Sequence, residues 1–221
     1  MSGRRSLAVQ QAAASENGSG CFSVFLLPLL GILLVGAFLF FLSSHLPPLP
    51  VSENPVLPGA LAPFFTPEVR YWEKDILVWS QTYRLDANLI ATVMQIESCG
   101  DPFARSPAGA SGLFQVMPYH FAAGENPFDV STNAMRGLSY LRRALERSGG
   151  DVHLALAIYN GGPARLEQEE RWWPAETQRY VYWGSGIYED ARSGAESSPR
   201  LQEWLERGGH GLCLQARARL P

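Results

Sequence analysis

The segment 86–98, DANLIATVMQIES, decides the fold of the central part of this chain. Asp86 is a residue type that caps helix N-termini. The residues after it are apolar on nearly every side of a helix, which is typical of a helix buried in a core. Glu97 stands at the end of this apolar stretch. The sequence therefore predicts a buried helix that ends near a carboxylate.

Glu97 is a candidate general acid. Apolar surroundings disfavour the ionised form of a carboxyl group and raise its pKa, so that it can carry a proton at neutral pH. A positioned acid of this kind can protonate the leaving oxygen of a glycosidic bond. The alternative is an ordinary solvated glutamate at a helix end. Other glutamates lie in plainly polar contexts: Glu73, Glu146, Glu167, Glu169 and Glu170.

Three further blocks follow Glu97 in order. They are SPAGASGLFQ (106–115), AIYNGG (157–162) and ETQRYV (176–181). Together with QIES, these blocks resemble the soluble lytic transglycosylases, bacterial cell-wall enzymes related to goose-type lysozyme. The resemblance covers about residues 75–188 and implies an all-α, lysozyme-like domain. It also implies cleavage of the bond between N-acetylmuramic acid and N-acetylglucosamine without water, which leaves a 1,6-anhydro end.

The resemblance also implies roles for individual residues. Glu97 corresponds to the single catalytic acid and base. Six residues correspond to positions that bind substrate or support the acid: Ser98 beside the acid and the N-acetyl group, Gln115 in the cleft, Tyr159 with its hydroxyl reaching the acid, Asn160 on the sugar, and Glu176 and Tyr180 near the acid. The chain departs from the pattern where Cys99 replaces the usual glycine, Phe114 a methionine and Ile158 an alanine.

Two other functions remain open at this point. Hydrolytic glycosidases generally use a second carboxylate. Asp101 lies in a proline turn and Asp129 is placed to cap a helix, so neither is an evident partner. This shortage argues against a goose-lysozyme-like muramidase, in which water would attack. A catalytically silent peptidoglycan-binding scaffold is the third possibility, and the intact Glu97, Tyr159 and Asn160 argue against it.

The chain divides into five parts by composition. We expect a disordered cytoplasmic tail (1–21), a transmembrane helix (22–42), a proline-rich linker (43–67), the catalytic domain (68–190) and a C-terminal extension (191–221). The uncharged segment 22–42 would span roughly the ~30 Å apolar core of a bilayer. A cleaved signal peptide is the alternative, but its apolar core is usually ~7 to 15 residues long and ends at a small-residue cleavage site.

Two arginines, Arg4 and Arg5, precede the apolar segment, and no lysine or arginine occurs between residues 43 and 69. Positive flanks stay in the cytoplasm, so we expect a single-pass membrane protein with an extracytoplasmic catalytic domain. Cys99 and Cys213 would then share an oxidising compartment and could form a disulfide. Two separate thiols are the alternative.

Composition weighs against several partners and cofactors. The chain has 18 basic and 21 acidic residues, and its arginines are scattered. It therefore lacks the basic patch of a nucleic-acid-binding protein. Three cysteines and four histidines without ligand-like spacing make a metal improbable. We expect no cofactor.

Periodicity predicts a succession of helices and no strand of useful length. An amphipathic helix is expected from Pro67 to Tyr83, and a loop with a short helical turn at 112–117 from Cys99 to Gly124. Further helices are expected about 134–145, 151–161 and 175–188. The signal weakens after Ala191, with one amphipathic turn at 201–205.

Overall fold

The computed structural model describes residues 60–220. This part is helical, and only isolated bridges occur outside the helices. Its α-helices are α2 (Pro67–Arg70), α3 (Glu73–Tyr83), α4 (Ala87–Glu97), α5 (Val130–Arg147), α6 (Val152–Gly161), α7 (Ala175–Arg192), α8 (Pro199–Trp204) and α9 (His210–Arg217). The short turns are η1 (Pro118–His120), η2 (Pro163–Glu167), η3 (Glu170–Trp172) and the π-helical η4 (Leu205–Gly209). The all-α prediction is confirmed for these residues.

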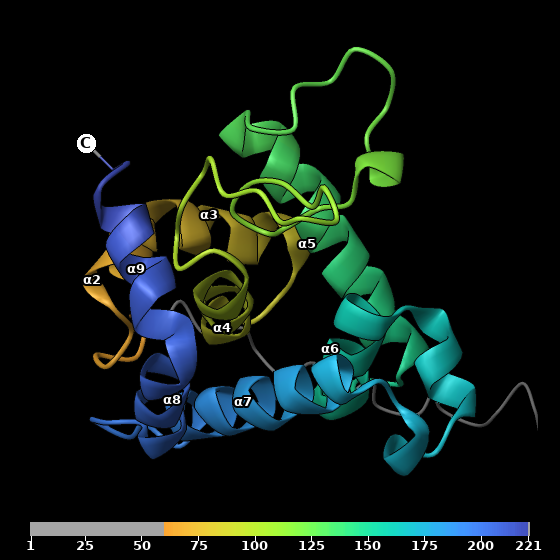
Figure 1. Ribbon diagram of the computed structural model, residues 1–221. Coiled ribbons are helices and arrows are strands. Elements are labelled where there is room, and N and C mark those ends of the chain that lie inside the picture. Colours follow the sequence, from red (N-terminus) through yellow and green to blue (C-terminus); the bar gives the residue numbers. More distant parts are fainter. Residues whose placement is uncertain (1–59, 221) are drawn as a thin grey trace, which may run out of the picture. The chain divides into compact units, whose positions relative to one another are not determined.

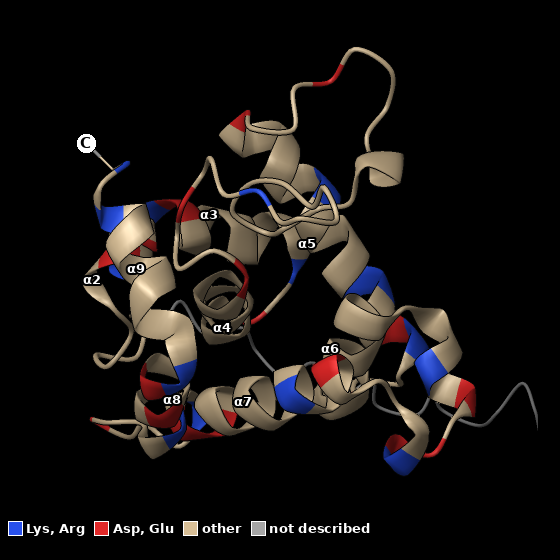
Figure 2. Cartoon of the chain, in the orientation of Figure 1, with Lys and Arg blue, Asp and Glu red and all other residues tan. Residues whose placement is uncertain are grey.

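α4 lies in the middle of the fold. Figure 1 looks nearly along its axis, with α3, α5, α7 and α9 around it. It contacts α2, α3 and α7. Figure 2 draws α4 almost wholly in tan, whereas α7 and α8 carry many charges. The predicted apolar helix is therefore buried, and its one carboxylate ends it.

Aspartates begin three of the helices, as their sequence positions predict. The carboxylate of Asp86 accepts hydrogen bonds from the backbone of Asn88 (2.8 Å) and Leu89 (3.2 Å). Asp129 caps α5, and Asp151 caps α6. Each carboxylate satisfies backbone N–H groups that have no partner inside the helix.

Three predictions of secondary structure were wrong. The helix expected from Pro67 to Tyr83 is two helices, because Trp72 leaves the helical region (ψ 9°) and its indole donates to the carbonyl of Gly100 (2.8 Å). The helical turn expected at 112–117 is a non-helical turn closed by antiparallel bridges. The C-terminal region, expected to hold one turn, forms α8, η4 and α9.

Among residues 60–220, no helix combines the length and apolar character that a membrane crossing needs. The expected transmembrane helix (22–42), the tail (1–21) and most of the linker (43–67) lie outside the described residues.

Candidate active site

Glu97 is the last residue of α4. Glu97 is partly buried, and two residues close to it in the chain, Gln95 and Ser98, are fully buried. Burial raises the pKa of its carboxyl group from 4.5 to about 8. Two smaller effects are included in this value: the hydroxyl of Tyr180 lowers the pKa, and the charge of Glu176 raises it. At neutral pH this carboxyl is therefore mostly protonated, as a general acid must be.

Two tyrosines lie beside the acid and play different parts. The buried hydroxyl of Tyr180 lies near the Glu97 carboxyl and lowers its pKa, and it makes no hydrogen bond among residues 60–220. The hydroxyl of Tyr159 instead donates to the backbone carbonyl of Phe114 (2.8 Å). Burial, then the neighbouring Glu97, raises the pKa of both phenols. The Tyr159 hydroxyl, which we expected to reach the acid, is thus engaged with a backbone carbonyl, and Tyr180 is a second phenol near the acid.

Ser98 has a supporting position. Its side chain is fully buried. Its hydroxyl donates a hydrogen bond to the carbonyl of Leu113 (2.8 Å) and accepts one from the backbone amide of Gly100 (3.1 Å). The hydroxyl is therefore occupied by backbone groups and is closed to a sugar. It ties the end of α4 to the loop that carries Gln115.

That loop has an unusual backbone. Gly112 (φ 76°) and Gln115 (φ 43°) both lie in the left-handed region, which is rare for a residue with a side chain and is found where a site is held by its surroundings. The Gln115 amide donates to the carbonyls of Ala104 (3.2 Å) and Gly112 (3.0 Å). Gln115 is partly exposed and lines the adjoining cavity.

Asn133, which lies in α5, holds this loop in place. Its buried amide donates to the carbonyls of Ser111 (2.7 Å) and Pro127 (2.9 Å) and accepts from the amide of Phe114 (3.0 Å). A Cβ at Gly112 would overlap this side chain. Sequence reasoning missed Asn133, although an asparagine one turn before Gly137, on the face that Ala134 and Leu138 mark as buried, is a signal for such a role.

A cavity of about 210 Å³ opens beside these residues. Three residues that sequence analysis selected line it, Gln115, Tyr159 and Asn160, and Glu97 does not itself line it. The side-chain carbonyl of Asn160 accepts a hydrogen bond from the hydroxyl of Thr177 (2.8 Å), which leaves the side-chain nitrogen as a donor. Tyr159 is common to the cavity and to the surroundings of the acid.

The cavity is also lined by aromatic residues that sequence reasoning did not select. The ring centroids of Tyr119, His120, Tyr140 and Tyr159 follow one another at 4.5, 4.9 and 5.6 Å. Burial, then the charge of Arg143, lowers the pKa of His120. A row of neutral rings along a concave surface suits the apolar faces of sugars.

The two aspartates that sequence analysis considered as a second carboxylate have other partners. Asp129 caps α5, and Asp101 is fully buried and accepts from the backbone of Phe103 (2.9 Å) and the side chains of Gln215 (3.1 Å) and Arg219 (2.8 Å). Glu176 is exposed, and its charge reaches Glu97. It is the candidate for any second carboxylate in a hydrolytic reaction.

One group within residues 60–220 has the spacing of metal ligands: Glu68, Cys99 and Cys213. The two cysteines form a disulfide with their Cα atoms 5.0 Å apart. Glu68 is paired with Arg217 (2.7 Å). Sulfurs joined to each other are not thiolate ligands, so this arrangement is a covalent link.

The family model for the transglycosylase SLT domain matches residues 75–179. This segment belongs to the transglycosylase SLT family. The matched segment includes Glu97, Gln115 and Tyr159. It ends just before Tyr180, and it leaves out α2, α8 and α9.

Relatives of the SLT domain occur in phage and bacteria. A transglycosylase of Enterobacteria phage PRD1 is 38% identical over 111 residues, which are 49% of this chain and 40% of the relative. The soluble lytic murein transglycosylase of Escherichia coli K12 is 34% identical over 82 residues, 32% of this chain and 13% of the relative. Membrane-bound lytic murein transglycosylase E of Buchnera aphidicola is 28% identical over 119 residues, 45% and 54% of the two chains.

The chain thus spans less than two thirds of the length of these relatives. Among solved structures, lytic transglycosylase Slt of Pseudomonas aeruginosa, an inactive mutant, is 22% identical with a TM-score of 0.45. The likeness covers 57% of this chain and 24% of that one.

Proposed function

We propose that this protein is a membrane-anchored peptidoglycan lytic transglycosylase. It would cleave the bond between N-acetylmuramic acid and N-acetylglucosamine and leave a 1,6-anhydromuramic acid end. The observation that carries the proposal is a single carboxyl at the end of a buried helix, with its pKa raised to about 8, near a cavity lined by aromatic rings.

The reaction needs one group that gives and then takes a proton. Protonated Glu97 donates its proton to the glycosidic oxygen, and the bond from that oxygen to C1 of the muramic acid breaks with its electron pair going to the oxygen. The glutamate is now a carboxylate. It accepts the proton of the muramic acid's own 6-hydroxyl as that oxygen bonds to C1. The anhydro ring forms, the acid is regenerated and no water is consumed.

The surroundings suit both halves of this cycle. Burial keeps the acid protonated before cleavage. The Tyr180 hydroxyl, which favours the ionised form, stabilises the carboxylate that cleavage produces. Gln115 and Asn160 at the cavity supply amides for the sugar's polar groups.

Membrane anchoring rests on the segment 22–42 and its flanking charges. Relatives that carry "membrane-bound" in their names support the same arrangement. The domain would then act on peptidoglycan from the outer face of the membrane.

The test compares variants on purified peptidoglycan sacculi. Glu97→Gln keeps the shape of the side chain but delivers no proton, and we expect a loss of about 10²-fold or more in the rate of product release. Glu167→Gln is the matched control, because Glu167 is exposed and outside the cavity. A Glu97→Gln variant with a rate near wild type would refute the proposal.

A goose-lysozyme-like muramidase is the second candidate, because the charge of Glu176 reaches Glu97. In that reaction Glu176 would activate water, and Glu176→Gln would abolish cleavage. In the lytic reaction the same change lowers the pKa of Glu97 and leaves cleavage at acidic and neutral pH largely intact.

A further inference from the structure

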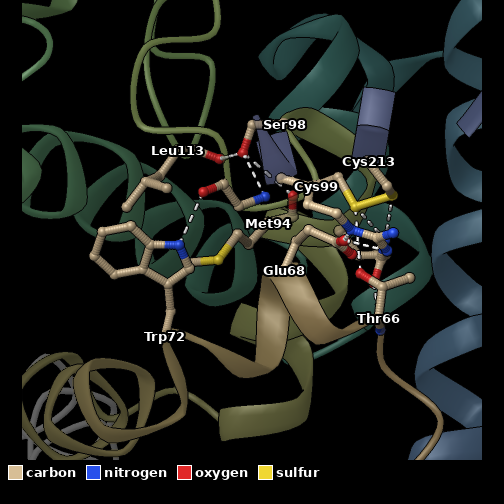
Figure 3. Close-up of a disulfide and its surroundings, with 11 residues drawn as sticks. Thr66, Glu68, Trp72, Met94, Ser98, Cys99, Leu113 and Cys213 are labelled. Carbon is tan, nitrogen blue, oxygen red and sulfur yellow. Dashed lines mark hydrogen bonds and ion pairs between the residues drawn. A yellow bond between two sulfur atoms is a disulfide. The ribbon is translucent and has the colours of Figure 1, made fainter. Parts of the chain in front are cut away.

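The turn that directly follows the acid, residues 98–101, is held by distant parts of the chain. Figure 3 shows Ser98 bonded to Leu113 on one side and the Cys99–Cys213 disulfide on the other. The indole of Trp72 donates to the carbonyl of Gly100. A Cβ at Gly100 would lie 2.7 Å from a backbone oxygen of α2, so α2 packs directly on the turn.

The strongest of these attachments come from α9. Cys213 of α9 is bonded to Cys99, two residues after the acid. Gln215 of α9 and Arg219 just beyond it both bond the fully buried carboxylate of Asp101, at 3.1 and 2.8 Å. Arg219 also donates to the carbonyl of Phe103 (3.1 Å). A buried carboxylate needs such partners, so α9 and the turn depend on each other.

α9 is fastened to α2 and α4 as well. Arg217 pairs with the buried carboxylate of Glu68 in α2. The side-chain amide of Gln95 in α4 donates to Cys213 Sγ of α9 (3.5 Å) and to Cys99 Sγ (3.1 Å), and its side-chain carbonyl accepts from the backbone of Thr66 (3.2 Å). α9, α2 and the end of α4 therefore form one connected cluster around the disulfide, as Figure 3 shows.

Cys99 needs this support because of its backbone. Its φ is 50°, in the left-handed region that glycine adopts freely and other residues adopt only against a steric penalty. Here a side chain occupies the position, and the bond to Cys213 holds it there.

We propose that Cys213 and Arg219 are positioning residues for the acid. Through Cys99 and Asp101 they hold the turn after α4, which keeps the Glu97 carboxyl in its apolar surroundings and facing Tyr180. They lie outside the segment that matches the SLT family, which ends at residue 179. Their effect on catalysis rests on the proposed function. Their effect on the carboxyl itself does not.

The test uses two matched pairs of variants of the full-length protein, purified in detergent. Cys99→Ala/Cys213→Ala removes the bond and leaves a side chain at the left-handed position. Cys99→Gly/Cys213→Ala removes the same bond but allows that backbone. Arg219→Ala removes an ion pair to Asp101, whereas Arg207→Ala removes an exposed arginine with no ion pair within residues 60–220.

Four quantities are measured for each variant: kcat on soluble glycan strands, KM on the same strands, the pH dependence of kcat, and the pKa of Glu97 from carboxyl carbon-13 NMR. A displaced catalytic group can lower a rate by ~10- to 100-fold. For Cys99→Ala/Cys213→Ala we expect kcat to fall about tenfold or more, KM to change little and the pKa of Glu97 to be lower. Cys99→Gly/Cys213→Ala should keep most of the activity. Arg219→Ala should lose kcat several-fold and Arg207→Ala none.

Variants that melt at lower temperature but keep the wild-type kcat and Glu97 pKa would show that α9 only stabilises the fold, and would overturn the proposal. If Cys99→Ala/Cys213→Ala does not fold, the comparison of Arg219→Ala with Arg207→Ala still decides it. If the wild type itself forms no anhydro product, the proposed function fails. The NMR comparison would then still decide whether α9 positions the carboxyl.

Discussion

Replacing Glu97 by glutamine should stabilise the protein, and more so as the pH rises. The carboxyl has a pKa of about 8 in the folded chain, against an ordinary value of 4.5. Between these values the folded state holds a proton that the unfolded state has released. The free energy of unfolding therefore falls as pH rises through this range, by about 1.4 kcal/mol per pH unit.

The loss of unfolding free energy that the buried Glu97 causes is nearly absent at pH 4, reaches about 3 kcal/mol at pH 7 and levels off above pH 8. Glutamine does not titrate, so Glu97→Gln removes this pH dependence. A loss of activity together with a gain of stability is the expected pattern for an acid that burial holds in an unfavourable environment.

Urea unfolding of wild type and Glu97→Gln at a series of pH values measures the effect. The difference in unfolding free energy should grow by about 3 kcal/mol from pH 4 to pH 7. Glu167→Gln, which removes an exposed carboxylate, should follow the wild-type curve. A constant offset between Glu97→Gln and wild type across this range would refute the burial of a protonated Glu97.

Four further predictions concern the site and the topology. Tyr180→Phe removes a hydroxyl that lowers the pKa of Glu97, so the alkaline decline of kcat should move to higher pH in a pH–rate profile; an unchanged or lower midpoint would contradict this. Asn133→Ala leaves buried backbone groups unpaired and should cost about 1 to 3 kcal/mol in denaturant unfolding, with reduced activity; wild-type stability would show that the loop holds itself. Thiol labelling of the unfolded, unreduced protein should modify only Cys21 of the three cysteines, and labelling of all three would show that no disulfide forms. A reporter that works only outside the cytoplasm, fused after Pro221, should be active, and an inactive reporter would overturn the topology.

Local chemistry explains why the centre of the fold could be predicted. Asp86 and Asp151 begin helices because their carboxylates satisfy free backbone N–H groups, and this needs no knowledge of distant residues. The apolar sides of α4 predict its burial in the same way. Burial in turn predicts the raised pKa of Glu97.

The rest depends on contacts between residues far apart in the chain. Arg219 and Asp101 are 118 positions apart, and Arg217 and Glu68 are 149 positions apart. No local sequence pattern therefore predicts that α9 contacts the turn after α4. Trp72 interrupts the expected helix for the same reason, since its indole bonds to Gly100. The position of the Tyr159 hydroxyl could not be predicted either, because it donates a hydrogen bond to the carbonyl of Phe114, 45 positions away.

In the proposed reaction, one carboxyl cleaves the glycan without water. Mass spectrometry of the products that the full-length protein releases from purified sacculi, with the reaction run in heavy-oxygen water, tests it most directly. We predict 1,6-anhydromuramic acid ends that are lighter by one water than hydrolysed ends, resist reduction and carry no heavy oxygen. Reducing muramic acid ends that contain heavy oxygen would show hydrolysis and contradict the account.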